Sequence, residues 1–355
     1  MNKPAYDTSA PVLVTGATGY VAGWLVKRLL EEGFTVHGAV RDPDDQKKVG
    51  HLVAMGNGAK GQLKLFRADL LEQGSYATAM AGCSVVFHTA SPFTSQITDP
   101  QRDLVDPALK GTRNVLGSAN ETPSVTRVVV TSSCAAIYGD AVDVAQTKNG
   151  KLTEADWNTT SSLDHQAYSY SKTLAERAAW EMEKAQDRWK LVTINPALVI
   201  GPATSDTQTS ESFALIAGFG DGRLKTGVPD FNIGMVDVRD VAEAHMRAAF
   251  VPEAEGRYIT FNKTISFFDA GQILRAKFGD SWPFPKRVMP KWLIWLVGPF
   301  IDKSITRRMV ARNMGHPWDA DNSKSRRELG MEYRALDGAL TEMFQQLIDT
   351  GRIAK

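Results

Sequence analysis

Two side chains near the middle of the chain have the types and the spacing that acid–base chemistry requires. Tyr168 and Lys172 lie four residues apart in the segment 168–185, whose periodicity predicts a helix, so both are expected on one helix face. An ammonium group beside a phenol favours the phenolate and lowers the pKa of the phenol. We therefore expect Tyr168 to act as a general acid in carbonyl reduction, or as a base in alcohol oxidation. Tyr170 is only two residues from Lys172 and is expected to face away.

A glycine-rich segment near the N-terminus has the composition of a phosphate-binding turn. It spans residues 15–23, between a predicted strand over 11–15 and a predicted helix over 20–32. Small residues let the backbone approach a pyrophosphate, and the helix N-terminus presents free N–H groups and a favourable dipole. The position between first strand and first helix makes the pattern specific. The residues expected to bind the dinucleotide here are Gly16, Thr18, Gly19, Tyr20 and Val21.

The end of the second predicted strand, 34–40, bears on the choice of nicotinamide cofactor. A site for NAD(H) usually places an acidic residue there to bind the ribose 2′-hydroxyl, but this chain has Val40 followed by Arg41. A guanidinium group matches a 2′-phosphate with paired, charge-assisted hydrogen bonds, and Lys48 adds positive charge nearby. The pattern therefore favours NADP(H) over NAD(H). Asp42 would weaken this prediction if its carboxylate turned inward to take the ribose role.

Strand and helix patterns alternate along the N-terminal half of the chain. Short apolar, β-branched runs predict strands, and the amphipathic segments between them predict helices. The predicted strands cover residues 11–15, 34–40, 63–67, 84–88, 127–131 and 190–194. This alternation is typical of an α/β protein with a doubly wound parallel sheet, the Rossmann fold.

After Pro196 the composition of the chain changes. The following residues are rich in Gly, Thr and Ser, and the tail is helical and basic. We therefore expect a smaller C-terminal domain that is interleaved with the first. The dinucleotide-binding domain is expected over 1–196 and 236–264, and the substrate-binding domain over 197–235 and 265–355. The cleft between the two domains is the expected ligand site.

Composition and charge exclude several classes of protein. The 355 residues include 41 Lys and Arg against 40 Asp and Glu, whereas nucleic-acid-binding proteins normally show a basic excess. Two cysteines, Cys83 and Cys134, cannot form a disulfide framework, and no Cys/His spacing indicates a metal site. The first ten residues lack a secretory pattern, so a cytoplasmic location is expected. The apolar stretch 292–301 is about half the ~20 residues that span a bilayer, so a buried or surface-docking helix is expected rather than a membrane contact.

The glycine spacing, Gly-x-x-Gly-x-x-Ala, and the position of Tyr168 and Lys172 between the fifth and sixth strands resemble the extended short-chain dehydrogenase/reductase superfamily. The resemblance implies that Lys172 binds the nicotinamide ribose and that a serine after the fifth strand holds the substrate carbonyl. Ser133 fits the position of that serine, and Ser132 is expected to point the opposite way. Counting back from downstream residues would place Cys134 there, but one inserted residue explains the offset better than a lost hydroxyl.

The same resemblance implies further contacts at the ends of the strands. Besides Tyr168 and Lys172, the implied cofactor contacts are Asp69, Leu70, Thr89, Ala90, Ser91, Thr131, Pro196, Leu198 and Val199. The candidate substrate contacts are Ser133, Phe93, Tyr138 and Tyr168. His88 and His245 are tempting as catalytic bases, but structural histidines near strand or helix ends are the simpler interpretation.

Several stretches resemble one branch of the superfamily, that of dihydroflavonol reductase and cinnamoyl-CoA reductase. They are residues 23–26, 40–43, 86–92 and 171–176. The resemblance implies NADPH-dependent, reversible reduction of an aldehyde or ketone to an alcohol. The expected partner is a small-molecule carbonyl or alcohol, and the expected assembly is a monomer or a homodimer. A pocket for an aromatic substrate is a hypothesis that rests on the eight tryptophans.

Three alternatives remain on the same scaffold: a sugar-nucleotide epimerase or dehydratase, a 3β-hydroxysteroid dehydrogenase, and a non-catalytic NADP(H) sensor. Arg41 in place of an acid, and Ala108 where epimerases carry an asparagine, disfavour the epimerase. Sensors usually lose the tyrosine and lysine pair, so the complete set of Ser133, Tyr168 and Lys172 argues for turnover.

Overall fold

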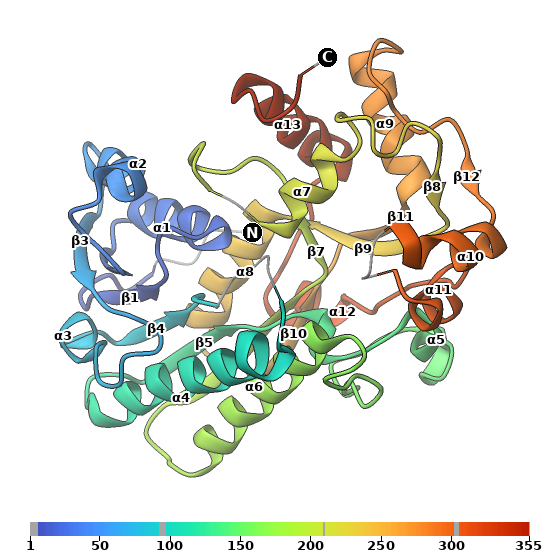
Figure 1. The fold of residues 1–355 in the computed structure, drawn as a ribbon. Helices are drawn as coiled ribbons and strands as arrows, with labels where there is room; N and C mark the ends of the chain where they lie inside the picture. The colour runs from blue at the N-terminus through green and yellow to red at the C-terminus, as the bar shows by residue number, and fades with distance from the viewer. Residues whose placement is uncertain (1–5, 92–96, 209, 302–304, 355) are drawn as a thin grey trace.

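The computed structural model describes residues 6–91, 97–208, 210–301 and 305–354. Its centre is a seven-stranded sheet in the order β10-β6-β5-β4-β1-β2-β3, in which every neighbouring pair runs parallel (Figure 1). The strands are β1 (Val12–Thr15), β2 (Thr35–Val40), β3 (Gln62–Arg67), β4 (Val85–His88), β5 (Arg127–Thr131), β6 (Lys190–Pro196) and β10 (Gly256–Thr260). The predicted fold class, a doubly wound parallel sheet, is confirmed.

Helices cover both faces of this sheet, and the alternation of side chains along the strands explains how. On β1, Val12 and Val14 belong to one apolar cluster and Leu13 to another, because successive side chains point to opposite faces. The helices of the first cluster are α1 (Tyr20–Glu32), α2 (Gln46–Gly56) and α8 (Val238–Phe250). The helices of the second cluster are α3 (Ala77–Met80), α4 (Asp106–Glu121) and α6 (Ala167–Lys184). Strands covered on both faces read as nearly continuous apolar runs, which is why the sequence revealed them.

The strand order reverses next to β1, and this reversal creates the crevice of the fold. β2 lies on one side of β1 and β4 on the other, so the loops that follow β1 and β4 diverge at the carboxyl edge of the sheet. The glycine-rich turn follows β1, residues 89–91 follow β4, and residues 132–133 follow β5. The topology therefore gathers the candidate site residues at one edge.

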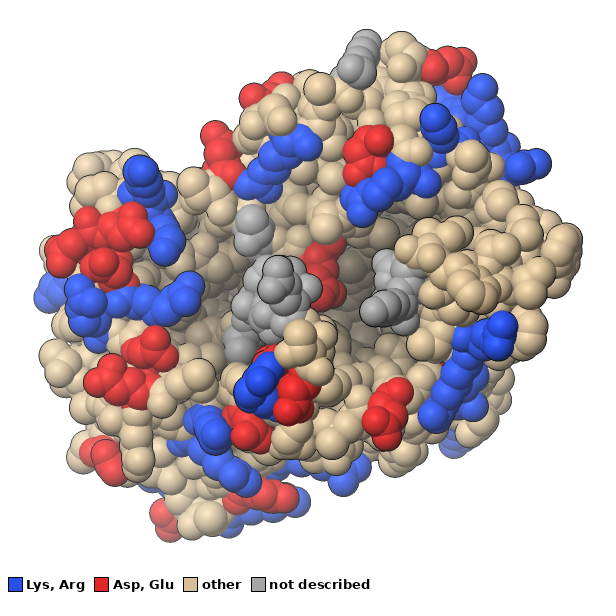
Figure 2. All heavy atoms as spheres, in the orientation of Figure 1, with Lys and Arg blue, Asp and Glu red and all other residues tan. Residues whose placement is uncertain are grey.

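The remaining elements form a second region around two small sheets, and the molecular surface is hollowed between this region and the large sheet (Figure 2). The strands here are β7 (Leu198–Ile200), β9 (Asn232–Asp237) and β11 (Lys263–Ser266) in one sheet, and β8 (Val228–Pro229) and β12 (Val288–Met289) in the other. The helices are α7 (Glu211–Ala217), α9 (Phe267–Phe278), α10 (Lys291–Ile301), α11 (Arg307–Asn313), α12 (Ser323–Glu328) and α13 (Leu336–Asp349). A separate apolar cluster that includes Leu340, Met343 and Phe344 packs α7, α9 and α13 together, whereas α12 packs against β10 of the large sheet.

Short elements complete the chain. They are η1 (Gln101–Val105), η2 (Cys134–Ala136), α5 (Ala141–Val144) and η3 (Lys148–Gly150). The stretch 292–301, expected to be a buried or surface-docking helix, lies in α10, and none of the described helices is long and apolar enough to cross a membrane. The free thiols of Cys83 and Cys134 are both buried.

Two glycines of the turn are required by close approach. Gly16 has φ +62°, and a Cβ atom there would lie 3.0 Å from the Cα of Ala90. A Cβ atom on Gly23 would lie 2.3 Å from Oγ1 of Thr204 and 2.7 Å from Nε2 of Gln208. The glycine that follows Ala22 is therefore the place where a loop from the second region packs onto α1.

We predict opposite effects for two identical substitutions in helices. Gly23→Ala should lower the free energy of unfolding by about 1–3 kcal/mol, because the added methyl group overpacks the contact with Thr204 and Gln208. Gly50→Ala in α2 meets no atom within 4 Å and should raise the same quantity by up to about 1 kcal/mol. Urea denaturation of both variants measures this; a neutral Gly23→Ala would contradict the packing argument.

Candidate active site

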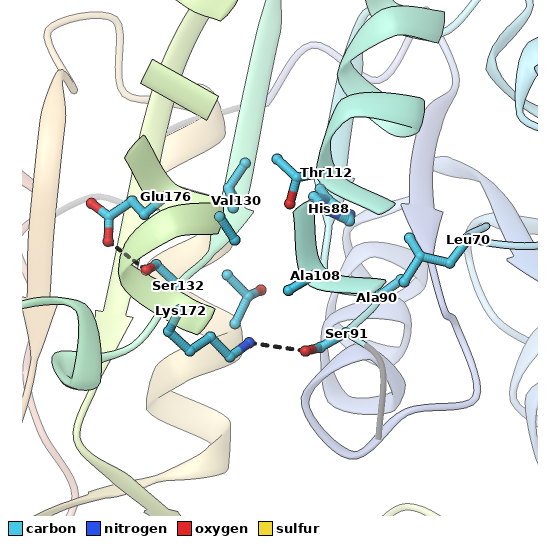
Figure 3. A pocket seen from close by; sticks show the side chains of 12 residues that line it. Leu70, His88, Ala90, Ser91, Ala108, Thr112, Val130, Ser132, Lys172 and Glu176 are labelled. Atoms are coloured by element: carbon cyan, nitrogen blue, oxygen red, sulfur yellow. Dashed lines mark hydrogen bonds between the residues drawn. The ribbon is translucent and has the colours of Figure 1, made fainter. Parts of the chain in front are cut away.

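Tyr168 and Lys172 lie on the same face of α6, as their spacing predicts. The Nζ atom of Lys172 is 5.7 Å from the centroid of the Tyr168 ring. Lys172 Nζ also donates a hydrogen bond of 2.9 Å to Oγ of Ser91, in the loop after β4 (Figure 3). The pair therefore bridges α6 to the loop that borders the crevice.

The structure corrects the expected direction of the Tyr168 pKa. Burial among protein atoms raises the pKa of Tyr168 well above its ordinary value, the carboxylate of Glu211 raises it further, and the nearby Ser133 hydroxyl lowers it. Burial also lowers the pKa of Lys172 to about 8, which weakens the ammonium that was expected to stabilise a phenolate. Tyr168 is nevertheless 44% exposed, so a substrate can reach a phenol that keeps its proton.

The two serines after β5 point to different sides. The Ser133 side chain is near enough to Tyr168 to lower the pKa of its hydroxyl, and it accepts a 3.1 Å hydrogen bond from the backbone N–H of Ala135. The Ser132 hydroxyl donates to the carboxylate of Glu176 and is buried (Figure 3). The structure thus brings Ser133, and not Ser132, next to Tyr168. Cys134 lies in the interior, where burial raises the pKa of its thiol.

A buried carboxylate holds the ends of several strands behind these residues. Glu176 is 1% exposed and forms an ion pair with Arg257 of β10, with an Nε–Oε1 distance of 2.6 Å. It also accepts a 2.7 Å hydrogen bond from Nδ2 of Asn195 in β6, and the same Nδ2 donates to the carbonyl oxygen of Ser133 at 3.2 Å. Glu176 therefore fixes the backbone that carries Ser133, a connection that the sequence analysis missed.

The glycine-rich turn is tied to the end of β4. The Thr15 hydroxyl accepts a 3.0 Å hydrogen bond from the N–H of Ala90, and the Thr89 hydroxyl donates to the Thr15 carbonyl. α1 begins at Tyr20 without a side-chain cap and without an acidic residue in its first turn. In contrast, Asp45 caps α2 and Asp237 caps α8. The free N–H groups at the start of α1 fit an anionic group such as a pyrophosphate.

A loop after β7 covers this turn, and its residues were also missed from the sequence. The buried Gln208 side chain donates to the carbonyl oxygens of Thr18 and Gly19 at 3.0 and 2.9 Å. The buried Tyr20 hydroxyl donates to the Gly201 carbonyl at 2.6 Å, while Val21 is half-buried beside it. The unusual Ala22-Gly23 step was the one signal in the sequence for this contact.

At the end of β2, Arg41 is exposed, and its side chain has no hydrogen-bond or ion-pair partner among the described residues. Asp42 is paired with Arg67 at 3.0 Å, so its carboxylate is turned toward the neighbouring strand end. Lys48 is exposed and its Nζ lies 3.4 Å from Asp45. Among the residues that the structure describes, the guanidinium of Arg41 is thus an unpaired cation at this strand end.

Other expected contacts lie around a small pocket and in β7. The pocket is lined in part by Leu70, Ala90, Ser91, Thr131 and Lys172 (Figure 3). The Asp69 carboxylate accepts from the backbone N–H of Leu71. Pro196 ends β6, and Leu198 and Val199 lie half-buried in β7.

Of the proposed substrate contacts, Tyr138 is half-buried, with its ring 5.7 Å from the ring of Trp318. Phe93 lies outside the described residues.

The two histidines near the site are buried and structural in their contacts. Burial lowers the pKa of His88 to about 3, and its Nδ1 lies 3.1 Å from the Thr15 hydroxyl. Burial likewise lowers the pKa of His245 to about 4. Its ring is held between the Thr131 hydroxyl and the Val241 carbonyl. Both rings are therefore neutral near pH 7.

Comparison with known proteins adds to this geometry. Residues 12–262 match the model of the NAD dependent epimerase/dehydratase family. A cinnamoyl-CoA reductase from Medicago truncatula is 44% identical over 268 residues, which cover 74% of this chain and 79% of the relative. The tetraketide alpha-pyrone reductase 1 of Arabidopsis thaliana is 35% identical, with 97% of both chains covered. The crystal structure of a yeast methylglyoxal/isovaleraldehyde reductase complexed with NADPH has a TM-score of 0.75 and 29% identity, covering 97% of this chain and 100% of that chain.

The chain belongs to the NAD dependent epimerase/dehydratase family. Its resemblance to the dihydroflavonol and cinnamoyl-CoA reductase branch of the extended short-chain dehydrogenases is confirmed. The protein is an oxidoreductase that acts on carbonyl or CH–OH groups with a nicotinamide cofactor.

We predict that the buried ion pair is essential for stability. Glu176→Ala should lower the free energy of unfolding by about 3–5 kcal/mol, because it leaves the Arg257 guanidinium unpaired in the interior. Glu31→Ala, which breaks the half-exposed pair with Lys27 on α1, should cost no more than about 1 kcal/mol. Chemical denaturation gives the free energy of unfolding of both variants. Equal losses would show that the buried pair of Glu176 contributes no more to stability than an exposed pair.

Proposed function

We propose that this protein reduces an aldehyde or a ketone to an alcohol with NADPH. The observation that carries the proposal is the grouping of Ser133, Tyr168 and Lys172, in which Ser133 is near the Tyr168 hydroxyl and Lys172 lies on the same helix face as Tyr168. This group stands at the carboxyl edge of the sheet, the edge at which ligands of doubly wound folds bind. The reductases among the relatives support the same reaction class.

The proposed chemistry divides into one proton transfer and one hydride transfer. NADPH, when bound, supplies the hydride to the carbonyl carbon. Tyr168 keeps its proton at neutral pH because its pKa is raised, and its hydroxyl donates that proton to the carbonyl oxygen as negative charge develops there. The Ser133 hydroxyl holds the same oxygen by a second hydrogen bond. In the reverse direction the phenolate of Tyr168 removes the proton of an alcohol.

Lys172 is proposed as the residue that binds the nicotinamide ribose and tunes Tyr168. Its Nζ already donates to the Ser91 hydroxyl, so a polar partner on the crevice side can complete its hydrogen bonds. Burial alone lowers the pKa of Lys172 to about 8, and hydroxyl acceptors favour the charged form again. A charged Lys172 in turn favours the phenolate of Tyr168 as the proton leaves it.

The proposed cofactor site extends from the glycine turn to β7. The pyrophosphate is proposed to lie against Gly16, Thr18 and Gly19 and the uncapped N-terminus of α1, beside Tyr20 and Val21. The adenine edge is proposed to lie at Asp69 and Leu70. Further contacts are proposed from the residues that border the crevice, which are Lys48, Thr89, Ala90, Ser91, Thr131, Pro196, Leu198 and Val199. We also propose that Gln208 orients the turn, since it binds two of its carbonyl oxygens.

The preference for NADP(H) is proposed to depend on Arg41. Its guanidinium is exposed and unpaired among the described residues, and the next residue, Asp42, is paired with Arg67. A 2′-phosphate would meet a free cation there rather than an acid. The reductase from yeast, 29% identical, was solved with NADPH.

The substrate is proposed to enter between the sheet and the second region, residues 197–235 and 265–355. Ser133 and Tyr168 would contact the carbonyl, and Tyr138 and Phe93 would contact the rest of the substrate. Tyr138 packs against the buried Trp318, so the substrate would meet an aromatic side chain there. The relatives act, by their names, on compounds as different as cinnamoyl-CoA and methylglyoxal, which leaves the size of the substrate to be determined.

Tyr168→Phe should reduce turnover by about 10²–10⁴-fold, because it removes the proton donor and keeps the ring. NADPH binding should remain nearly intact. The control is Tyr170→Phe, the same substitution on the other side of the helix, which should leave turnover close to that of the wild type. NADPH oxidation against a panel of carbonyls measures the rates, and full activity in Tyr168→Phe would refute the acid assignment.

Arg41→Ala should weaken NADPH binding by about 10–150-fold, the value of a lost charge-assisted hydrogen bond. NADH binding should change little, because NADH carries no 2′-phosphate. Lys27→Ala removes one positive charge from the far part of α1 and serves as the control for general electrostatics. Equal losses for both cofactors in Arg41→Ala would mean that this residue does not bind the 2′-phosphate.

A further inference from the structure

α10 presents its apolar stripe to solvent instead of to the core. Trp292, Trp295, Leu296 and Phe300 follow one another at helical spacing, and their exposed fractions are 68%, 42%, 48% and 84%. Ile301 is 75% exposed. Residues spaced in this way lie on one helix face. The face is therefore a continuous apolar strip that the described residues leave uncovered.

α13, another long helix of the second region, buries its apolar side chains in the usual way. α13 buries Leu340, Met343 and Leu347 completely or nearly so, whereas the only buried residue of α10 is Gly298. Large apolar side chains on a surface usually mark a site of interaction. In Figure 2 the right-hand side of the molecule, where Figure 1 places α10, is a broad area without charged side chains, with positive side chains along its lower border.

Positive charge is concentrated around this helix. The sequence from 281 to 318 contains seven Lys and Arg but one Asp, although the whole chain has a net charge of +1. Lys286 and Arg287 precede α10 and are exposed, and Arg307 and Arg308 begin α11, which packs against α10. The guanidinium of Arg307 lies 4.8 Å from the centroid of the Trp295 ring. Arg307 therefore lies against the strip, and the segment around the strip carries further cations and no carboxylate among its described residues.

We propose that α10 docks on an anionic lipid surface, with its axis in the plane of the membrane. Tryptophan and phenylalanine side chains with neighbouring lysine and arginine are the composition of interfacial helices. The apolar strip would enter the headgroup boundary while Arg307, Arg308 and Lys286 meet lipid phosphates and carboxylates. Eleven residues are too short to cross a bilayer, so the contact is peripheral. The inference is independent of the proposed reaction.

The charge distribution favours a lipid surface over a second copy of the chain. In a two-fold symmetric dimer the same patch faces itself, so Arg307 and Arg308 of both copies would be brought together without an acidic partner from the described residues of 281–318. Juxtaposed like charges oppose such an association. An anionic lipid surface would bury the apolar side chains of the strip and would also supply negative charge to the cations beside it.

The test is co-sedimentation of the full chain with vesicles of phosphatidylcholine alone and of phosphatidylcholine mixed with phosphatidylserine. The wild type should bind the mixed vesicles at least about tenfold more strongly than the neutral ones, and high salt should reduce the difference. Phe300→Asp should weaken binding about tenfold or more, and the double variant R307E/R308E should abolish the preference for phosphatidylserine. Val53→Asp, on the exposed side of α2, is the control and should bind like the wild type.

Circular dichroism and NADPH binding must first show that the variants are folded; they should be, because the altered side chains are exposed. Failure of the folded wild type to bind either kind of vesicle would overturn the proposal. Equal binding of Phe300→Asp and wild type would do the same. Concentration-dependent dimerisation that Phe300→Asp abolishes, without vesicle binding, would assign the face to a second copy and would also overturn it.

Discussion

The architecture of the site depends on one buried carboxylate. Glu176 lies two helical turns beyond Tyr168 on α6, where it pairs with Arg257 and hydrogen-bonds to Asn195. A charge in the interior is tolerated only when it is paired and fully hydrogen-bonded, so α6, β6 and β10 must meet in one arrangement. The Asn195 amide passes this constraint on to the backbone of Ser133. One face of α6 thus extends from the buried Glu176 to the phenol of Tyr168, the proposed proton donor, at the crevice.

On the other side of the crevice, a few hydrogen bonds hold the glycine-rich turn in place. The glycine turn needs bare backbone to approach a phosphate, and bare backbone leaves carbonyl groups that require donors. Gln208 supplies them for Thr18 and Gly19 from a loop of the second region. The absent side chain of Gly23 provides the room. Gln208 and Gly23 therefore connect the turn that is proposed to bind the dinucleotide with the region that is proposed to hold the substrate.

Much of this arrangement could be predicted from local sequence, and the exceptions have clear physical causes. α1 and β5 have the predicted bounds, because periodicity and apolar runs are local properties. The family resemblance and the fold class were likewise predicted and are confirmed. The partners of Glu176 and Gln208 come from segments 81 and 189 residues away, and no local pattern reports such contacts. The direction of the Tyr168 pKa also depended on burial, which spacing alone does not reveal.

The central claim is that the chain transfers a hydride from NADPH to a carbonyl carbon beside Tyr168. The most direct measurement is deuterium transfer from NADPH labelled at nicotinamide C4, using a panel of aromatic and aliphatic aldehydes, ketones and β-keto esters, followed by mass spectrometry of the alcohols. The account predicts one deuterium on the carbinol carbon for each NADPH consumed, with NADH far less effective. Tight NADPH binding without deuterium in any alcohol, together with conversion of a UDP-sugar, would contradict it.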